Sequence, residues 1–252
     1  RPRVEAWLEI RAAVAAATDG DAEACQRRLQ RAAGGFADPR VRAACWERGG
    51  EALLAAGQPH VAEPALAAAV DLRTAHQPAS PALAFSLVQL FRSDPRAHGA
   101  AAERALEIYA ALDGESLELA RAHNCVAISA FYRADLDTAR RQYERALEIV
   151  RRTGPGGAAE CDLIGNLGLL ALCEGDFEGA TSLFGKQMEV ALGLGAATAQ
   201  FAYAATYRGL LAKKTGRLAE ARRYYGQALE AFRTLHPESR EVAGVLTNLG
   251  NT

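Results

Sequence analysis

The stretch from residue 120 to residue 150 limits the possible folds of this chain more than any other. Leu136, Ala139, Tyr143 and Ala146 recur there at steps of three and four residues. That spacing places side chains on one face of an α-helix. A second helical pattern precedes it, with a short break between the two. The stretch therefore predicts a helical hairpin.

The hairpin pattern returns with a constant period of 41 residues. Ala127 is followed at this step by three small residues, Gly168, Gly209 and Gly250. The same step leads from Ala139 to Ala180 and Ala221, and from Tyr143 to Phe184 and Tyr225. A fixed period with fixed small and aromatic positions is typical of a solenoid, in which each repeat packs only on its neighbours.

The residues at these positions are similar to those of the tetratricopeptide repeat family. One repeat carries Leu167, Gly168, Gly175, Phe177, Ala180 and Phe184, and the next carries Leu218, Ala221, Tyr225 and Ala228. The period exceeds the common 34 residues and resembles the longer repeats of kinesin light chains and of bacterial signalling proteins. The resemblance implies an all-α fold, a right-handed solenoid of antiparallel helix pairs. It implies no particular chemistry.

The same small position can be followed toward the start of the chain through Ser86, Gly50 and Ala13. We therefore expect a single array over residues 1–252, with units at about 4–33, 38–76, 81–113, 116–152, 158–194, 198–234 and a truncated seventh at 239–252. The last unit stops inside a helix. It has no polar capping helix of the kind that solenoid ends usually carry. We interpret the chain as a fragment of a longer protein.

Local signals add detail to individual units. Asp94 followed by Pro95 predicts an N-cap and the first residue of the second helix in unit three. His236 and Pro237 are expected to close unit six. Arg208 departs from the family pattern, because an apolar residue is expected before Gly209. That departure predicts either a looser fit in unit six or a salt bridge.

Composition narrows the function classes. The net charge of −1 gives no general attraction to nucleic acid or anionic membrane, and no apolar run approaches a membrane span. The chain has five cysteines and no Cys-x-x-Cys pair. We expect buried free thiols in a reducing cytoplasm at Cys25, Cys45, Cys125, Cys161 and Cys173. Only three of the 29 basic residues are lysine, Lys186, Lys213 and Lys214, which suggests a GC-rich bacterial source.

No motif indicates catalysis or a cofactor. The glycine-rich segment 154–157 follows a helical pattern rather than a strand, so we interpret it as a helix-ending loop instead of a phosphate loop. His123 and Cys125 are two residues apart and point to different helix faces, which argues against a catalytic pair. No metal-ligand spacing occurs. We expect no enzymatic activity, no cofactor and no metal.

The resemblance implies a concave groove lined by the first helix of each unit. By register, units four to six contribute Arg121, Asn124, Ile128, Phe131, Tyr132, Asp162, Leu169, Leu172, Tyr203, Thr206, Leu210, Lys213 and Lys214, and unit three adds Leu83, Leu87, Leu90 and Phe91. Relatives with long repeats also use groove asparagines to hold peptide backbone, which points to Asn166 and Asn248. An apolar strip with aromatic members and a few charges suits an amphipathic helix or an extended peptide.

The sequence therefore predicts a non-catalytic scaffold or sensor arm that binds a protein or peptide, including the parent protein's own domains, and neither nucleic acid nor membrane. Two other interpretations stay open. One is a self-assembly module that pairs through its groove or its uncapped end. The other is an autoregulatory region of an enzyme, such as a protease, a kinase or a STAND-type ATPase.

Overall fold

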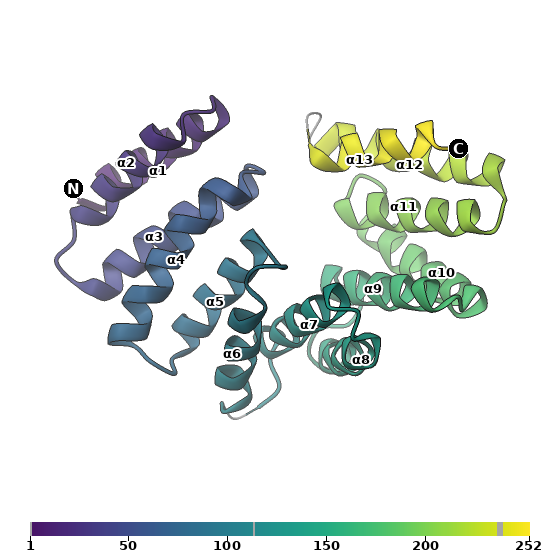
Figure 1. The fold of residues 1–252 in the computed structure, drawn as a ribbon, viewed down its shortest axis with the longest axis horizontal. Coiled ribbons are helices and arrows are strands. Elements are labelled where there is room, and N and C mark those ends of the chain that lie inside the picture. The colour runs from purple at the N-terminus through teal and green to yellow at the C-terminus, as the bar shows by residue number, and fades with distance from the viewer. Residues whose placement is uncertain (1, 113, 236–238) are drawn as a thin grey trace. The chain divides into compact units, whose positions relative to one another are not determined.

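A computed structural model describes residues 2–112, 114–235 and 239–252, and over these ranges the chain forms thirteen α-helices and no strand (Figure 1). The predicted all-α solenoid fold is confirmed. The helices are α1 (Pro2–Thr18), α2 (Ala22–Gly34), α3 (Pro39–Ala55), α4 (Pro59–His76), α5 (Pro81–Ser93), α6 (Gly99–Ala110), α7 (Leu117–Tyr132), α8 (Leu136–Thr153), α9 (Ala158–Glu174), α10 (Phe177–Leu194), α11 (Ala199–Lys214), α12 (Leu218–Leu235) and α13 (Arg240–Gly250). None of these described helices is long and apolar enough to cross a bilayer.

The chain divides into two compact units. Unit 1 comprises residues 1–114 and 121–132, and unit 2 comprises residues 115–120 and 133–252. In unit 1, α1 packs on α2, α3 on α4 and α5 on α6, and the first helices α1, α3 and α5 also touch in sequence. The core of this unit is rich in alanine and leucine, with Leu29, Leu53 and Leu66 almost fully buried.

Unit 2 follows the same plan with larger rings in its interior. Helix α9 packs on α10 and α11 on α12, and the first helices α9 and α11 also touch each other. Phe184 and Tyr225 are fully buried. Rows of alanine at the helix contacts let the backbones approach closely, while the aromatic side chains fill the remaining space.

The turns between paired helices share one backbone conformation. Gly175 and Gly216 have φ values of +82° and +77°, in the left-handed region that glycine tolerates. Ala134 occupies the same repeat position between α7 and α8 with φ +59°. The helix that follows each turn begins with an aspartate side chain in two cases: Asp135 accepts from the Thr138 amide at 3.1 Å and Asp176 from the Gly179 amide at 2.8 Å.

The small residues of the repeat lie where side chains from the second helix press against the first. A Cβ atom on Gly50 would lie 2.5 Å from the Leu66 side chain. One on Gly168 would lie 2.5 Å from the Phe184 ring, and one on Gly209 would lie 2.6 Å from the Tyr225 ring. At these three positions a side chain would displace its neighbour, so a small residue is a steric requirement there.

Two local expectations were wrong, those for the start of α6 and for Cys173, and Gly250 differs in its packing from the other small positions. Helix α6 begins at Gly99 and not at Pro95, because the Asp94 carboxylate accepts from the amides of Arg96 and Ala97 and closes a separate turn. No described atom lies within 4 Å of a Cβ placed on Gly250, so this glycine makes no close approach. Cys173 is exposed near the end of α9, unlike the other four thiols.

Two further local predictions concern Arg208 and the end of unit six. Arg208 makes no salt bridge among the described residues and instead stacks over the Tyr224 ring at 4.8 Å. Gly209 still fits tightly, so the arginine is accommodated without loosening the repeat. The predicted closure of unit six at His236 and Pro237 lies outside the described residues, as does Asp113.

Candidate functional site

The residues predicted to line the groove fall in both units, and each unit presents its own part. In unit 1, Arg121 and Tyr132 of α7 are exposed, whereas Asn124, Ile128 and Phe131 are half-buried. The Phe131 and Tyr132 rings meet edge to face at 6.3 Å.

The Tyr132 ring has a neighbour on one of its faces. The Arg96 guanidinium lies 5.0 Å from its centroid, a cation–π contact within the turn that precedes α6 and the end of α7. Tyr132 nevertheless remains 49% exposed. The aromatic pair on α7 is therefore held in place by its own unit and still open on one side.

The apolar residues that unit three was expected to add to the groove are buried instead. Leu83, Leu87, Leu90 and Phe91 are at most 8% exposed. They face neighbouring helices because α5 packs against α3, α4 and α6. This part of the groove prediction is corrected.

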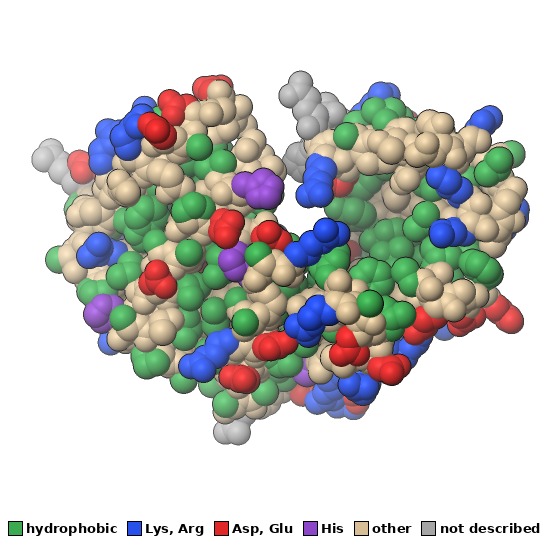
Figure 2. Space-filling model, viewed as in Figure 1, with side chains coloured by type: hydrophobic (Ala, Val, Ile, Leu, Met, Phe, Trp, Pro, Cys, Tyr) green, Lys and Arg blue, Asp and Glu red, His purple; other side chains and the backbone are tan. Residues whose placement is uncertain are grey.

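In unit 2 the predicted residues show a graded exposure along α9 and α11. Asp162 and Lys214 are exposed, Leu172 is buried, and the remaining members are half-buried: Asn166, Leu169, Tyr203, Thr206, Leu210, Lys213 and Asn248. Figure 2 shows hydrophobic side chains gathered in a hollow between α9 and α11, with basic side chains at its border. An apolar floor with a polar rim is typical of a surface that contacts a ligand.

A polar cluster lies at one end of this surface. The Tyr203 hydroxyl donates a hydrogen bond to Oε1 of Glu241 on α13 at 3.3 Å. Asp162 of α9 accepts a hydrogen bond from the Gln200 side chain of α11. Three first helices thus contribute to one group of side chains.

The electrostatics of the cluster follow from its surroundings. The side chains around the Asp162 carboxyl group reduce its hydration and raise its pKa to about 6, although the hydrogen bond from Gln200 opposes the shift. Burial raises the pKa of the Tyr203 phenol well above its usual range, and the nearby Glu241 and Asp162 carboxylates add to the shift. Negative charge is therefore concentrated beside an aromatic ring, an environment that favours a cationic group.

An aromatic layer lies below the cluster. Tyr203 packs edge to face on Phe232 at 5.1 Å and lies 6.4 Å from Tyr207, whose ring is 5.6 Å from Phe184. A Cβ on Gly165 would lie 2.3 Å from the Gln187 amide nitrogen and 3.0 Å from the Tyr207 ring. Gly165 is therefore small because these side chains pass beneath α9.

Sequence reasoning missed Gln200, Tyr207 and Glu241. The signal was present in the repeat, since Tyr207 is one 41-residue step from both Asn166 and Asn248. Gln200 and Glu241 are likewise one step apart. Extending the register to every first-helix position would have found all three.

Several side chains on this surface are already engaged locally. The Thr206 hydroxyl donates to the Ala202 carbonyl one turn earlier at 2.8 Å. Leu172 belongs to the apolar cluster that includes Phe184 and Leu211. These two residues shape the surface more than they offer groups to a ligand.

The described residues offer no metal site, since no group of three or more His, Cys, Asp or Glu side chains comes together among them. Burial raises the pKa of both the Cys125 and the Cys161 thiols to about 12. Both groups are therefore neutral thiols near pH 7, and thiols are much weaker nucleophiles than thiolates.

Paired helices, alternating first and second along the chain, define this protein as a helical-hairpin solenoid. A model of the tetratricopeptide repeat family matches residues 118–192. Over these residues the resemblance of the sequence to the tetratricopeptide repeat family is confirmed.

Solved structures show the same fold at low identity. A Rap protein complexed with competence and sporulation factor matches with a TM-score of 0.62 and 14% identity, over 100% of this chain and 75% of that one. The apo form of RapI matches with a TM-score of 0.65 and 12% identity, over 92% and 99%. A signal transduction ATPase with a tetratricopeptide repeat sensor from Pyrococcus horikoshii matches with a TM-score of 0.59 and 14% identity, over 98% of this chain and 42% of that one. No curated protein matches the sequence.

Proposed function

We propose that the chain is a non-catalytic binding module that holds a protein or peptide segment on the first-helix face of unit 2. The observation that supports this most strongly is the cluster of Asp162, Tyr203 and Glu241, which comes from three successive first helices. The two carboxylates of this cluster contribute little to apolar packing, and a charged and aromatic surface beside half-buried leucines suits a peptide.

The chemistry of the surface specifies the segment further. Carboxylates beside the Tyr203 ring favour a lysine or arginine side chain at that end. Leu169 and Leu210 offer apolar contacts farther along α9 and α11, and Lys213 and Lys214 carry positive charge at the C-terminal end of α11. A ligand with a basic residue, an apolar centre and an acidic residue matches this order.

The wider context is also part of the proposal. We place the chain in the cytoplasm of a bacterium, as the sensor or scaffold arm of a larger signalling protein. The fold shared with Rap proteins and with a STAND ATPase sensor supports that placement, as does the scarcity of lysine. The Phe131 and Tyr132 pair of unit 1 is proposed as a second contact for the same class of ligand.

The test compares two variants that carry the same change in charge. Asp162→Asn with Lys214→Glu alters the proposed surface, whereas Glu189→Gln with Lys186→Glu alters exposed residues of the second helix α10. Each protein is immobilised and exposed to source-cell lysate, and bound proteins are identified by mass spectrometry. We expect a specific protein to be retained by the wild type and the α10 variant and lost from the surface variant.

The opposite result is equally informative. Equal retention by all three proteins would contradict binding on the unit 2 surface. If no protein is retained and sedimentation shows a mass that rises with concentration, the chain is a self-assembly module and the proposal is wrong. Recovery of only the parent protein would favour the autoregulatory interpretation.

A further inference from the structure

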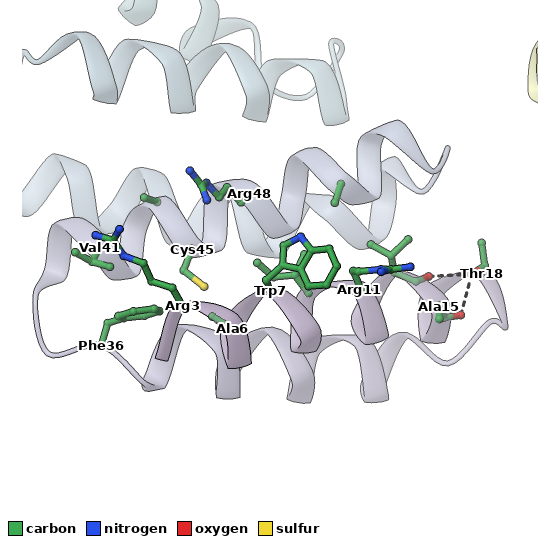
Figure 3. Close-up of a pocket in the computed structure, with 14 residues that line it drawn as sticks. Arg3, Ala6, Trp7, Arg11, Ala15, Thr18, Phe36, Val41, Cys45 and Arg48 are labelled. Atoms are coloured by element: carbon green, nitrogen blue, oxygen red, sulfur yellow. Dashed lines mark hydrogen bonds between the residues drawn. The ribbon is translucent and has the colours of Figure 1, made fainter. Parts of the chain in front are cut away.

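Unit 1 contains a pocket that the groove prediction did not include. It lies between α1 and α3, has a volume of about 900 Å³, and is open to solvent along α1. Figure 3 shows Trp7 and Arg11 side by side on α1, with Arg3 one turn earlier and Arg48 on α3. Phe36 and Val41 close the end near the α2–α3 connection.

The charges around this pocket are of one sign. The fourteen described residues that line it include Arg3, Arg11 and Arg48 and no aspartate or glutamate. Among the residues that the structure describes, no carboxylate lies within 4.0 Å of any of these three guanidinium groups. The Arg11 guanidinium instead stacks over the Trp7 ring at 4.8 Å.

Helix α1 separates its charges between two faces. Glu9 points toward α2, where it pairs with Arg28 at 3.3 Å and Arg31 at 3.5 Å. The arginines that face the pocket receive no such partner from α1. Arg48 lowers the pKa of the nearby Glu51 carboxyl group on α3. Burial and the neighbouring Glu47 raise the pKa of Glu51 more strongly. The pocket thus keeps a net positive potential.

The spacing along α1 fits a ligand of defined length. Arg3, Trp7 and Arg11 are four residues apart, so they share one face and span about 12 Å at 1.5 Å per residue. An extended peptide advances about 3.3 Å per residue, and its alternate side chains share a face. Residues i, i+2 and i+4 of such a peptide would therefore meet Arg3, Trp7 and Arg11 in turn.

We propose that this pocket binds an extended peptide segment in which a large apolar side chain has an aspartate or glutamate two residues before and two residues after it. The apolar side chain contacts Trp7 and the floor of the pocket, and the two carboxylates pair with Arg3 and Arg11. Arg48 adds positive charge from α3. The pocket belongs to unit 1 and does not depend on the surface proposed in unit 2.

The probe is a fluorescein-labelled synthetic peptide, Ser-Glu-Ser-Phe-Ser-Glu-Ser, titrated with the full chain and followed by fluorescence anisotropy. Two control peptides replace both glutamates by glutamine, or phenylalanine by alanine. We expect each control to bind at least tenfold more weakly than the probe. We also expect binding of the probe to weaken as salt is raised, because the contacts are exposed charge pairs.

A variant pair then assigns the binding to the pocket. Arg3→Gln, Arg11→Gln and Arg48→Gln together should weaken the probe at least tenfold. The matched control, Arg27→Gln, Arg40→Gln and Arg42→Gln, removes the same charge from exposed positions outside the pocket and should leave affinity within twofold. All six side chains are exposed, so helicity by circular dichroism should match the wild type in both variants.

Three results would overturn the proposal. The first is no saturable binding of the probe at millimolar protein. The second is equal loss of affinity in the two triple variants, which would indicate a general charge effect. The third is a dimer in sedimentation that only the pocket variant abolishes and that excludes the probe, since a second copy of the chain would then be the occupant.

Discussion

The two compact units solve the same packing problem with different chemistry. In unit 2 the small positions Gly168 and Gly209 lie under the rings of Phe184 and Tyr225. In unit 1, Gly50 keeps such a fit against the Leu66 side chain, but Ser86 at the same repeat position is fully buried and donates a hydrogen bond to the Glu47 carboxylate. In α5 the tight apolar fit within one hairpin is thus replaced by a polar contact between first helices.

The polar contact in unit 1 is part of a buried charge pair. Arg73 of α4 pairs with Glu47 of α3 at 3.1 Å, and both side chains are at most 11% exposed. The Arg73 Nη1 group also donates to Gln77 at 3.3 Å, while its Nε group has no partner among the described residues. The pair links α3, α4 and α5, whereas each glycine–ring contact in unit 2 links only two helices. The polar contact in unit 1 therefore requires the desolvation of two charges, which the glycine–ring contacts of unit 2 do not.

The largest effect is expected from breaking the charge pair between Glu47 and Arg73. Glu47→Leu leaves Arg73 buried without its counter-ion and Ser86 without its acceptor. Loss of one partner from a buried pair costs about 3–5 kcal/mol, and we expect a loss of that size in the free energy of unfolding measured with urea. The double variant Glu47→Leu with Arg73→Met should cost less than the single one. A double variant at least as unstable as the single would show that the two charges do not depend on each other.

The next prediction concerns the steric contact of unit 2. Gly168→Leu places a side chain where the Phe184 ring already lies, and overpacking of this kind costs about 1–3 kcal/mol. Gly226→Ala is the matched control, because no described atom lies within 4 Å of its Cβ position and it is within α12. We expect that change to stabilise the protein by about 0.5–1 kcal/mol in the same urea titration. An unchanged midpoint for Gly168→Leu would disprove the register of the repeat.

These contacts also show what the sequence can and cannot predict. The 41-residue period located Gly168 and Gly209 correctly because a steric requirement recurs at each step. It also identified Ser86 as small, yet it could not predict that Ser86 bonds to Glu47, 39 residues away, because that contact depends on how neighbouring hairpins pack. Position in the repeat likewise selects Asp162 and Tyr203, whereas their partners depend on side-chain orientation.

The remaining failures have local causes. Asp94 caps a short turn instead of the helix. Aspartate side chains often accept hydrogen bonds from nearby backbone amides, and such turns compete with helix formation. Leu83 and Phe91 were expected in the groove because the register of α7 was carried back to α5. Ser86 of α5 and Ala127 of α7 are 41 residues apart, but α5 packs against α3, α4 and α6, and Leu83 and Phe91 are buried there. Identical spacing therefore did not guarantee identical exposure.

The smallest effect is expected at Asp162. Glu47 of unit 1 pairs with a buried arginine, whereas Asp162 of unit 2 has no arginine within 4.0 Å among the described residues. The pKa of Asp162 is raised to about 6 in the folded state, against about 3.9 in an unfolded chain. Between these values the folded state holds the proton more tightly, so stability falls as pH rises from about 4 to about 6 and stays reduced above that.

Asp162→Asn removes this pH dependence while keeping a side chain that can bond to Gln200. We expect the variant to be more stable than the wild type at pH 8, by less than about 1 kcal/mol because the exposed carboxyl group is partly solvated. The advantage should shrink at pH 4.5, where the wild-type carboxyl group is protonated in the folded state. Urea titrations of both proteins at the two pH values measure the difference. A wild type that is more stable at pH 8 would mean that the ionised carboxylate has a favourable partner, and the contrast with Glu47 would then disappear.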